Sequence, residues 1–367
     1  MSDRYRIDGQ KIIYHPQRVA DLVAAVDRWP LAQHCYPIYV EISPIGACNH
    51  RCTFCAVDYL GYAPLRLDAS LLGRQLQEMG RLGVKSVMFA GEGEPLLHTE
   101  INQMVVAAAA AGIDVSFTTN ATVIPDQFME SALPHISWIK ASVNGGTAES
   151  YAAIHQTKRG DFAKVVENLR QLVAYRNRQQ LQCVIGAQLL LLPENRDEVV
   201  ALARLCRDEI GLDYLVVKPY SQHGFSLTQR YAAIDYSADL ALGEALQAES
   251  DGRFKTIFRT QAMRKQSGEV GERYSRCYST PMLWAYLKAD GELYSCSAYL
   301  GDPRFALGNV MEEGFATVWQ GEKRAENYRL LAEELDITHC RQNCRMDEIN
   351  RYLDQLIGES VPHVNFI

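Results

Sequence analysis

Ten cysteines are many for a chain of 367 residues, and most of them fall into two groups. The first group has the spacing C-x3-C-x2-C and comprises Cys48, Cys52 and Cys55. The second group is spread more widely and comprises Cys277, Cys296, Cys340 and Cys344. Clustered cysteines in a chain of this kind favour metal ligation or thiol chemistry over a disulfide framework.

The first group is dense enough to hold one face of an iron–sulfur cube. A [4Fe–4S] cube with three cysteine ligands keeps one iron open for an external ligand, and the same difference separates catalytic from structural zinc sites. Two alternatives remain: a zinc knuckle in which His50 supplies the fourth ligand, and three ordinary buried thiols.

Several polar residues stand on predicted strands or just after them. The run Gly91-Glu92-Gly93-Glu94-Pro95 follows the strand predicted at 84–90. The other candidates belong to later strands and are Asn120, Ser142, Asn144, Gln188, Lys218 and Tyr220. Because the chemistry of parallel barrels sits at the carboxyl ends of the strands, we expect these residues to share one site. The alternatives are helix capping for the asparagines and serine, a satisfied core amide for Gln188 and a packed lid for Tyr220.

The elements that position these residues alternate along the chain. Strands are predicted at 38–42, 84–90, 114–119, 137–142, 182–191 and 214–217, and the helix after residue 68 is capped by Asp68. Helices of 10–15 residues between strands indicate βαβ units and a parallel sheet. Six such units are too few for a closed eight-stranded barrel, so the fold class is α/β, with a partial, TIM-like (β/α)6 barrel.

The pattern divides the chain into four parts. Residues 1–37 form a helical preface, 38–225 the barrel, 226–275 a polar and irregular connecting segment, and 276–367 a small second domain. The second domain contains a predicted β-hairpin around Ala289-Asp290-Gly291 and ends in a helix at 347–357.

The C-x3-C-x2-C motif with the aromatic Phe54, together with the later motifs in this order, resembles the radical S-adenosylmethionine (SAM) superfamily. The resemblance implies that Cys48, Cys52 and Cys55 ligate a catalytic [4Fe–4S] cluster whose open iron chelates SAM, with Phe54 beside the adenine. It further implies that SAM is cleaved reductively to a 5′-deoxyadenosyl radical, which takes a hydrogen atom from the substrate. The protein must then hold SAM in line with the cluster and exclude water.

The resemblance extends to the residues that bind SAM. The glycine–glutamate run is similar to the family's Gly-Gly-Glu-Pro motif, which binds the SAM ammonium group: Gly91 and Gly93 permit close approach of the backbone, and Glu94 adds negative charge. Glu92 stands where a glycine is usual. By the same resemblance, hydrogen bonds to the SAM ribose and carboxylate are assigned to Asn120, Ser142 and Asn144, with Gln188 as a further candidate.

The spacing of Cys277, Gly291 and Cys296 resembles the start of the SPASM/twitch extension of radical SAM enzymes, and 307–310 and 318–319 resemble its middle. A full SPASM domain has seven cysteines, whereas this group has four. The resemblance therefore implies the shorter twitch form, in which Cys277, Cys296, Cys340 and Cys344 ligate a second, auxiliary [4Fe–4S] cluster. A structural zinc ion at the same four thiols is the alternative.

The leading hypothesis for the reaction is oxidation or dehydration of a small polar metabolite, similar to a carbohydrate or an aminocyclitol, with help from the auxiliary cluster. Lys218 and Tyr220 are the candidates for binding a phosphate or sugar hydroxyls, or for moving protons. Other hypotheses are a radical SAM enzyme that modifies peptides or proteins, a radical SAM epimerase with Cys183 as a weak candidate for the hydrogen donor, and a non-catalytic zinc-binding module.

Charge and hydropathy exclude some partners. The formal net charge of −7 argues against a broad basic face for nucleic acid or for anionic membranes. The run Arg253, Lys255, Arg259, Arg264 and Lys265 is interpreted as a solvated helix face, with an anion-binding patch over the pocket as the alternative. The polar start and the short apolar runs predict a cytoplasmic protein. The expected partners are the small-molecule substrate and a low-potential electron donor such as flavodoxin or ferredoxin.

Overall fold

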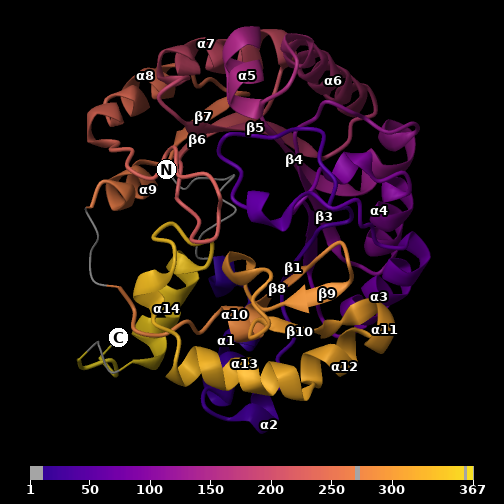
Figure 1. Ribbon diagram of the computed structural model, residues 1–367, viewed down its shortest axis with the longest axis vertical. Coiled ribbons are helices and arrows are strands. Elements are labelled where there is room, and N and C mark those ends of the chain that lie inside the picture. Colours follow the sequence, from indigo (N-terminus) through magenta and orange to yellow (C-terminus); the bar gives the residue numbers. More distant parts are fainter. Residues whose placement is uncertain (1–10, 269–272, 359–361, 367) are drawn as a thin grey trace.

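A computed structural model describes residues 11–268, 273–358 and 362–366, and its strands form one sheet in the order β10-β9-β8-β1-β2-β3-β4-β5-β6-β7 (Figure 1). The strands are β1 (Tyr39–Ile42), β2 (Ser86–Phe89), β3 (Asp114–Thr119), β4 (Ile136–Ser142), β5 (Val184–Leu191), β6 (Tyr214–Pro219), β7 (Lys255–Phe258), β8 (Trp284–Leu287), β9 (Glu292–Tyr294) and β10 (Ala306–Asn309).

Helices cover the outer, convex side of this sheet, including the side of its C-terminal strands β8 to β10 (Figure 1). They are α1 (Pro16–Ala25), α2 (Trp29–Ala32), α3 (Ala69–Arg81), α4 (Ile101–Ala110), α5 (Ala148–His155), α6 (Arg159–Arg178), α7 (Val199–Arg204), α8 (Leu242–Ala248), α9 (Thr260–Gln266), α10 (Thr280–Leu283), α11 (Val310–Glu313), α12 (Phe315–Gln320), α13 (Glu322–Glu333) and α14 (Asp347–Ile357). Two short π-helical turns occur at Phe128–Ala132 and Leu205–Ile210.

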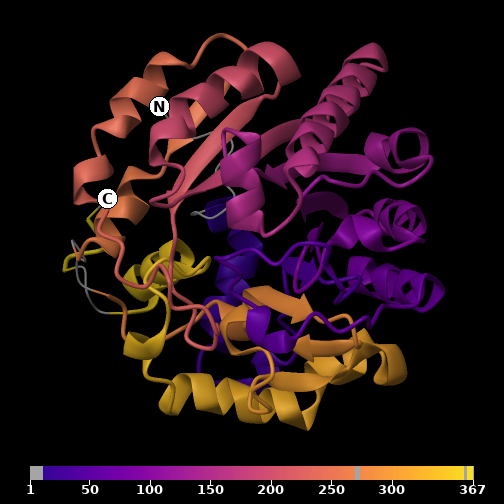
Figure 2. The same cartoon turned by 45° about the horizontal axis from the view of Figure 1, so that its top comes forward.

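The sheet curls into a barrel that does not close. Strands β1 to β7 pair in parallel in chain order, and β8 adds to the other side of β1, also in parallel. The edge strands among the described residues are β7 and β10, and α14 lies between these two edges of the sheet (Figures 1 and 2). Lys265 of α9 holds α14 there through ion pairs with Asp347 and Glu348. The predicted partial α/β barrel is therefore confirmed.

Strand β7 is an element that the sequence analysis did not predict. It lies in the stretch described as polar and irregular, and its backbone joins the sheet where Lys255 N–H donates to Asp213 O and Arg259 N–H to Val217 O. Of its four residues only Thr256 is fully buried, so no apolar run marks it as a strand. The basic run is consequently not one helix face, because it is divided between β7, α9 and the segments beside them.

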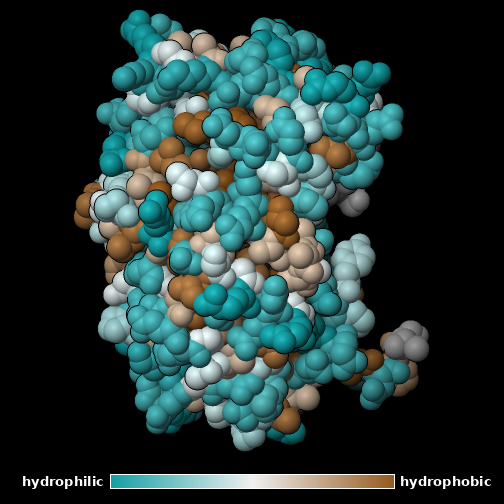
Figure 3. All heavy atoms as spheres, turned by 90° about the vertical axis from the view of Figure 1, so that its right-hand side faces the viewer, coloured by the Kyte–Doolittle hydropathy of each residue, from teal (hydrophilic) through white to brown (hydrophobic). Residues whose placement is uncertain are grey.

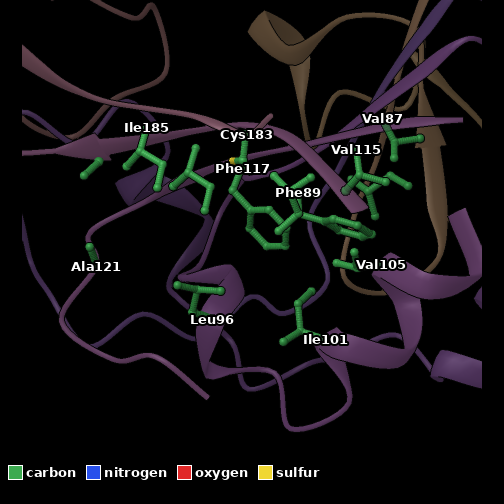
Figure 4. Close-up of a cluster of buried hydrophobic side chains, with 14 of the residues drawn as sticks. Val87, Phe89, Leu96, Ile101, Val105, Val115, Phe117, Ala121, Cys183 and Ile185 are labelled. Atoms are coloured by element: carbon green, nitrogen blue, oxygen red, sulfur yellow. The ribbon is translucent and has the colours of Figure 1, made fainter. Parts of the chain in front are cut away.

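Local sequence signals explain the elements that were predicted. Asp68 caps α3 by accepting a hydrogen bond from Leu71 N–H, and the buried residues Leu72, Leu76 and Met79 form the apolar stripe of this helix. Phe89 and Phe117 on neighbouring parallel strands pack with ring centroids 5.3 Å apart. Figure 4 shows them among the apolar side chains that join the sheet to its outer helices.

The C-terminal part is continuous with the barrel sheet. Strands β8 and β9 form the predicted antiparallel hairpin, and Gly291 in its turn has φ +88°. The guanidinium of Arg324 on α13 is buried between the rings of Trp29 and Trp319. It donates hydrogen bonds to four backbone carbonyls, those of Ala32, Cys35, Pro281 and Trp319. This one side chain connects the N-terminal helices to the C-terminal part.

The outer face of the barrel helices is largely hydrophilic, with hydrophobic side chains scattered singly or in small groups (Figure 3). Within the described ranges, every helix is either too short or too polar to span a bilayer.

Candidate active site

Cys48, Cys52 and Cys55 lie on the loop that leaves β1 at the carboxyl edge of the sheet. The end of α5 holds this loop, because Arg51 N–H donates to His155 O and Thr53 N–H donates to Ile154 O. The three thiols have no disulfide partner, and their charges are close enough to influence one another. Cys52 and Cys55 face a cavity of about 680 Å³ inside the barrel.

The surroundings of these thiols fit an iron–sulfur cluster. Burial raises the pKa of Cys48 to about 11 and also raises the pKa values of Cys52 and Cys55. Without a bound cluster, the three thiols are therefore protonated at neutral pH. Iron binding has to displace their protons. Three partly buried thiols on one loop, two of them facing the cavity, are a donor set that fits iron–sulfur chemistry.

Gly91 and Gly93 pack the glycine–glutamate run against the cysteine loop. A Cβ on Gly93 would lie 2.2 Å from Ile45 O and 2.4 Å from Ala47 O, so only glycine fits there. Gly91 has φ +112°, and a Cβ on it would lie 2.5 Å from the Cβ of Ser43. The two motifs that the sequence analysis assigned to one site are thus in direct contact.

The carboxylate of Glu94 contacts the carboxyl end of β3. It is buried and accepts hydrogen bonds from Leu96 N–H, the Thr119 hydroxyl and Asn120 N–H. Burial raises the pKa of Glu94 to about 7. The side chain of Asn120 in turn donates to Asn49 Oδ1 at 2.7 Å, which fixes it against the cysteine loop.

Glu92 replaces the glycine that is usual at its position, and the structure gives it a partner in the C-terminal part. Its carboxylate accepts a hydrogen bond of 2.8 Å from Ala289 N–H in the turn of the β8–β9 hairpin. Burial raises the pKa of Glu92. The substitution therefore connects the glycine–glutamate run to the second domain.

The candidates on β4 and β5 fall into two environments. Ser142 and Gln188 are partners in the register of these strands, and Gln188 lines the cavity. Asn144 is fully buried, and its side chain contacts Leu190 N–H and His155 instead of the cavity. The structure thus places Ser142, the last residue of β4, beside Gln188 within β5, and it places Asn144 outside the cavity lining.

Phe54, Lys218 and Tyr220 line the same cavity as Cys52 and Cys55. Tyr220 donates a hydrogen bond of 3.0 Å to Gln222 Oε1, and burial raises its pKa. Its ring packs on Tyr231 at 5.5 Å, so it is both a wall of the cavity and part of a packed aromatic pair. Lys218 is shared with a second, smaller cavity.

The four later cysteines meet in this second cavity of about 190 Å³. Burial raises the pKa of Cys344 to about 11 and that of Cys296 as well, and each is raised further by other thiols of the group. Asn350 Nδ2 donates to Cys277 Sγ at 3.3 Å, which places α14 against this group. Four partly buried thiols in one cavity fit either a closed iron–sulfur cluster or a zinc ion.

Two residues near the site were missed by the sequence analysis, and a third was placed differently. Arg341 lines both cavities, and His155 lies 3.2 Å from Cys52 Sγ. Arg259, assigned to a solvated helix face with an anion-binding patch as the alternative, also lines both cavities. Arg259 follows the unpredicted strand β7, and His155 ends α5, which was also not predicted. The capping pair Thr147 and Ser150 is the signal that marks the start of α5.

The cysteines outside the two groups do not line either cavity. Cys183 packs into the apolar core between the sheet and its helices (Figure 4), and burial raises its pKa to about 12. Cys206 is in the same core, and Cys35 lies in the cluster around α1. None of the three lines either cavity, as far as the described residues extend.

Family models match the two cysteine-bearing regions separately. The model of the radical SAM superfamily matches residues 42–206, and that of the SPASM iron–sulfur cluster-binding domain matches 277–345. The chain belongs to the radical SAM superfamily and is a radical SAM enzyme with a C-terminal SPASM domain. The expected use of SAM and iron–sulfur clusters follows from these two domains.

Individual relatives differ in what they do. The GTP 3′,8-cyclase of Chlorobaculum tepidum is 26% identical over 263 residues, which are 70% of this chain and 78% of the relative. The tungsten-containing aldehyde ferredoxin oxidoreductase cofactor-modifying protein of Pyrococcus furiosus is 22% identical over 78% of this chain and 81% of its own. The dTDP-4-amino-4,6-dideoxy-D-glucose ammonia-lyase of Streptomyces venezuelae is 26% identical over 50% of this chain and 38% of its own.

Solved structures share the fold. Streptococcus suis SuiB superposes with a TM-score of 0.62 at 18% identity, covering 87% of this chain and 73% of SuiB. Native anSMEcpe with bound AdoMet superposes with a TM-score of 0.56 at 16% identity, covering 88% of this chain and 96% of its own. At these identities the likeness establishes the arrangement of barrel and C-terminal domain and leaves the substrate open.

Proposed function

We propose that this enzyme uses SAM to oxidise or dehydrate a small, polar metabolite that carries an anionic group. The observation that carries the proposal is the larger cavity, which extends from Cys52 and Cys55 to Cys344 of the second group. Its volume of about 680 Å³ lies in the range of small-molecule sites, roughly 300–1,000 Å³. A substrate bound there lies between the two groups of cysteines.

We assign the cofactors on the same basis. Cys48, Cys52 and Cys55 hold a catalytic [4Fe–4S] cluster with an open iron for SAM, and Cys277, Cys296, Cys340 and Cys344 hold an auxiliary [4Fe–4S] cluster. When bound, these groups supply the one-electron chemistry that removes a hydrogen atom and then an electron from the substrate. Phe54, Gly91, Gly93, Glu94, Asn120, Ser142 and Gln188 form the SAM pocket. We keep the four-part division of the chain as part of the proposal, with β7 of the 226–275 segment added to the barrel sheet.

The charge of the cavity wall supports an anionic substrate. Five cationic side chains line the cavity, whereas only two carboxylates do: Lys218, Arg259, Lys265, Arg341 and Arg345 against Asp347 and Glu348. Arg345 is paired with Glu41, which does not line the cavity, and the remaining cations still outnumber the carboxylates by four to two. A phosphate or carboxylate would find strong charge-assisted hydrogen bonds on this wall.

Arg341 is the cation whose environment points most directly to a ligand. Burial lowers the pKa of its guanidinium, and its Nε–H is buried without a hydrogen-bond partner. Its Nη2 donates to Ser221 O at 3.1 Å, and this hydrogen bond holds the guanidinium in the wall that the two cavities share. An unpaired buried donor costs free energy that an anionic ligand would recover. Lys218 and Tyr220 are assigned to substrate binding and proton transfer on the same wall.

A competing assignment is the modification of peptides. It is supported by the fold of SuiB, which has been solved bound to its precursor peptide SuiA. The sugar and nucleotide substrates named for the curated relatives support the metabolite instead. Epimerisation through a cysteine is the weaker proposal, because Cys35, Cys183 and Cys206 are outside both cavities.

Substrate-dependent formation of 5′-deoxyadenosine tests the assignment. Anaerobic, reconstituted enzyme receives SAM, a low-potential donor such as flavodoxin or ferredoxin, and one of three pools: sugar phosphates with nucleotide sugars, their neutral parent sugars, or peptides. We expect a burst with the first pool alone. Lys218→Ala weakens this response, whereas Lys323→Ala, an exposed lysine on α13, leaves it unchanged. A burst with peptides alone would favour peptide modification over the metabolite reaction. A burst with neutral sugars would contradict the proposal that the substrate carries an anionic group.

A further inference from the structure

His155 is a buried side chain that the roles assigned above do not use. It ends α5 and is only 1% exposed. Its Nδ1 atom lies 3.2 Å from Sγ of Cys52, the central cysteine of the first motif. Whether this contact attracts or repels depends on which ring nitrogen carries the proton.

The neighbours of the opposite nitrogen decide the tautomer. The backbone N–H of Asn144 points at His155 Nε2 from 3.2 Å, and a backbone N–H can only donate. The side chain of Asn144 gives the same answer, because its Oδ1 accepts a hydrogen bond of 2.7 Å from Leu190 N–H. Its Nδ2 must then be the atom that faces Nε2 at 3.3 Å. With two donors directed at it, Nε2 is the acceptor and bears no proton.

A neutral imidazole without a proton on Nε2 carries it on Nδ1. The charged ring is excluded by the same contacts, because an imidazolium carries a proton on Nε2 as well, and that proton would point at the two donors of Asn144. The ring is also fixed in place, since it stacks on Tyr151 with centroids 4.2 Å apart and meets Phe54 edge-on at 5.7 Å. The Nδ1–H bond is therefore directed at Cys52 Sγ.

The same tautomer argues against His155 as a metal ligand through Nδ1. Such a ligand needs a lone pair on Nδ1 and hence a proton on Nε2, which would bring Nε2–H against the Asn144 N–H. His50, Cys52 and His155 form a group whose ligand atoms lie within 4.8 Å of one another. The hydrogen bonding of Asn144 makes this group a cysteine sulfur facing a hydrogen-bond donor rather than a three-ligand metal site.

We propose that His155 donates an N–H···S hydrogen bond to the thiolate of Cys52 and thereby raises the reduction potential of the cluster that Cys52 ligates. Hydrogen bonds to cluster sulfurs stabilise the reduced, more negative state. His155 is a positioning residue in this scheme. Asn144 acts on His155 and not on the cluster, because it fixes the tautomer of the imidazole ring. The inference rests on the proposed ligand role of Cys52.

The test is a redox titration of the reconstituted holoenzyme, followed by electron paramagnetic resonance (EPR). The catalytic cluster is recognised as the signal that changes when SAM is added, and the auxiliary cluster is the internal reference. His155→Phe keeps a ring against Tyr151 but removes the donor. We expect it to lower the potential of the SAM-sensitive cluster by at least a tenfold change in the one-electron equilibrium constant, about 59 mV, with the reference unchanged. His155→Gln, which retains a donor, restores part of the shift.

Nitrogen hyperfine spectroscopy on wild-type enzyme with 15N-labelled histidine covers the case in which His155→Phe does not assemble. We expect a weak coupling from one histidine nitrogen to the reduced catalytic cluster. A strong coupling would make the histidine a ligand, and no coupling, or an unshifted potential in His155→Phe, would equally overturn the inference. Loss of the SAM-sensitive signal from wild-type enzyme would instead contradict the proposed function, so the two failures are distinguishable.

Discussion

Replacing Glu94 by glutamine removes a carboxylate that the fold holds away from water at the centre of three hydrogen bonds. The pKa of Glu94 rises from 4.5 to about 7 because burial disfavours its charged form. Between pH 4.5 and 7 the native protein therefore keeps a proton that the unfolded chain has released. In this window the free energy of unfolding falls as pH rises, by about 1.4 kcal/mol per unit and about 3 kcal/mol in total.

Urea denaturation at several pH values from 5 to 8, under anaerobic reducing conditions, measures this contribution. We expect the stability of the wild type relative to Glu94→Gln to fall by about 3 kcal/mol across the window and to become level above pH 7. Glu100→Gln, at an exposed position on the same segment, provides the matched control and should follow the wild type. Parallel curves for wild type and Glu94→Gln would refute the assignment of a buried, neutral carboxyl below pH 7.

The same variant affects binding. The amide nitrogen of glutamine has to face one of the N–H or O–H donors that now point at the carboxylate, so at least one hydrogen bond to Asn120, Thr119 or Leu96 is lost. Losing a hydrogen bond to a charged group costs about 1.5–3 kcal/mol, which corresponds to a weakening of SAM binding by roughly 10- to 100-fold if Asn120 moves with it. Equilibrium binding of SAM to reconstituted protein at pH 8 measures this change.

Three further predictions concern the cysteines and Arg324. Cys52→Ala removes a proposed ligand of the catalytic cluster, so SAM cleavage should stop; retained 5′-deoxyadenosine formation would exclude Cys52 from that cluster. Cys296→Ala should lower the iron content without abolishing SAM cleavage, while product formation is lost; normal turnover would make the second site dispensable. Arg324→Met removes a donor from four buried carbonyls, of which those of Ala32 and Cys35 keep another N–H donor, and should lower the free energy of unfolding by about 2–6 kcal/mol, roughly 1–3 kcal/mol for each of the other two. Arg329→Met, at a solvent-exposed position on the same helix, is the control, and equal urea midpoints would contradict the role of Arg324.

Local signals account for the parts of this fold that could be predicted. The cap at Asp68 and the stripe of Leu72, Leu76 and Met79 depend only on residues a few positions apart, and α3 follows from them. The glycine turn of the β8–β9 hairpin is equally local. The spacing of Cys48, Cys52 and Cys55 places three thiols on one loop whatever surrounds them. Motifs of this kind are independent of the rest of the chain, and they were sufficient to indicate the class of enzyme.

Contacts between distant segments were decided by the tertiary structure alone. Strand β7 is defined by its pairing with β6, because its own residues lack the apolar run of a buried strand. Glu92 contacts Ala289, which lies nearly two hundred residues further along the chain, and no local pattern at either position predicts this contact.

The chain by itself determined which residue types are available for radical chemistry and in what order. The folded structure decided which of them meet: the cationic side chains on the wall between two groups of cysteines, and Asn144 behind His155 rather than in the cavity. The physical reason is that periodicity and spacing report on neighbours in sequence, whereas the charge of a cavity and the tautomer of a buried histidine are set by groups that only packing brings together.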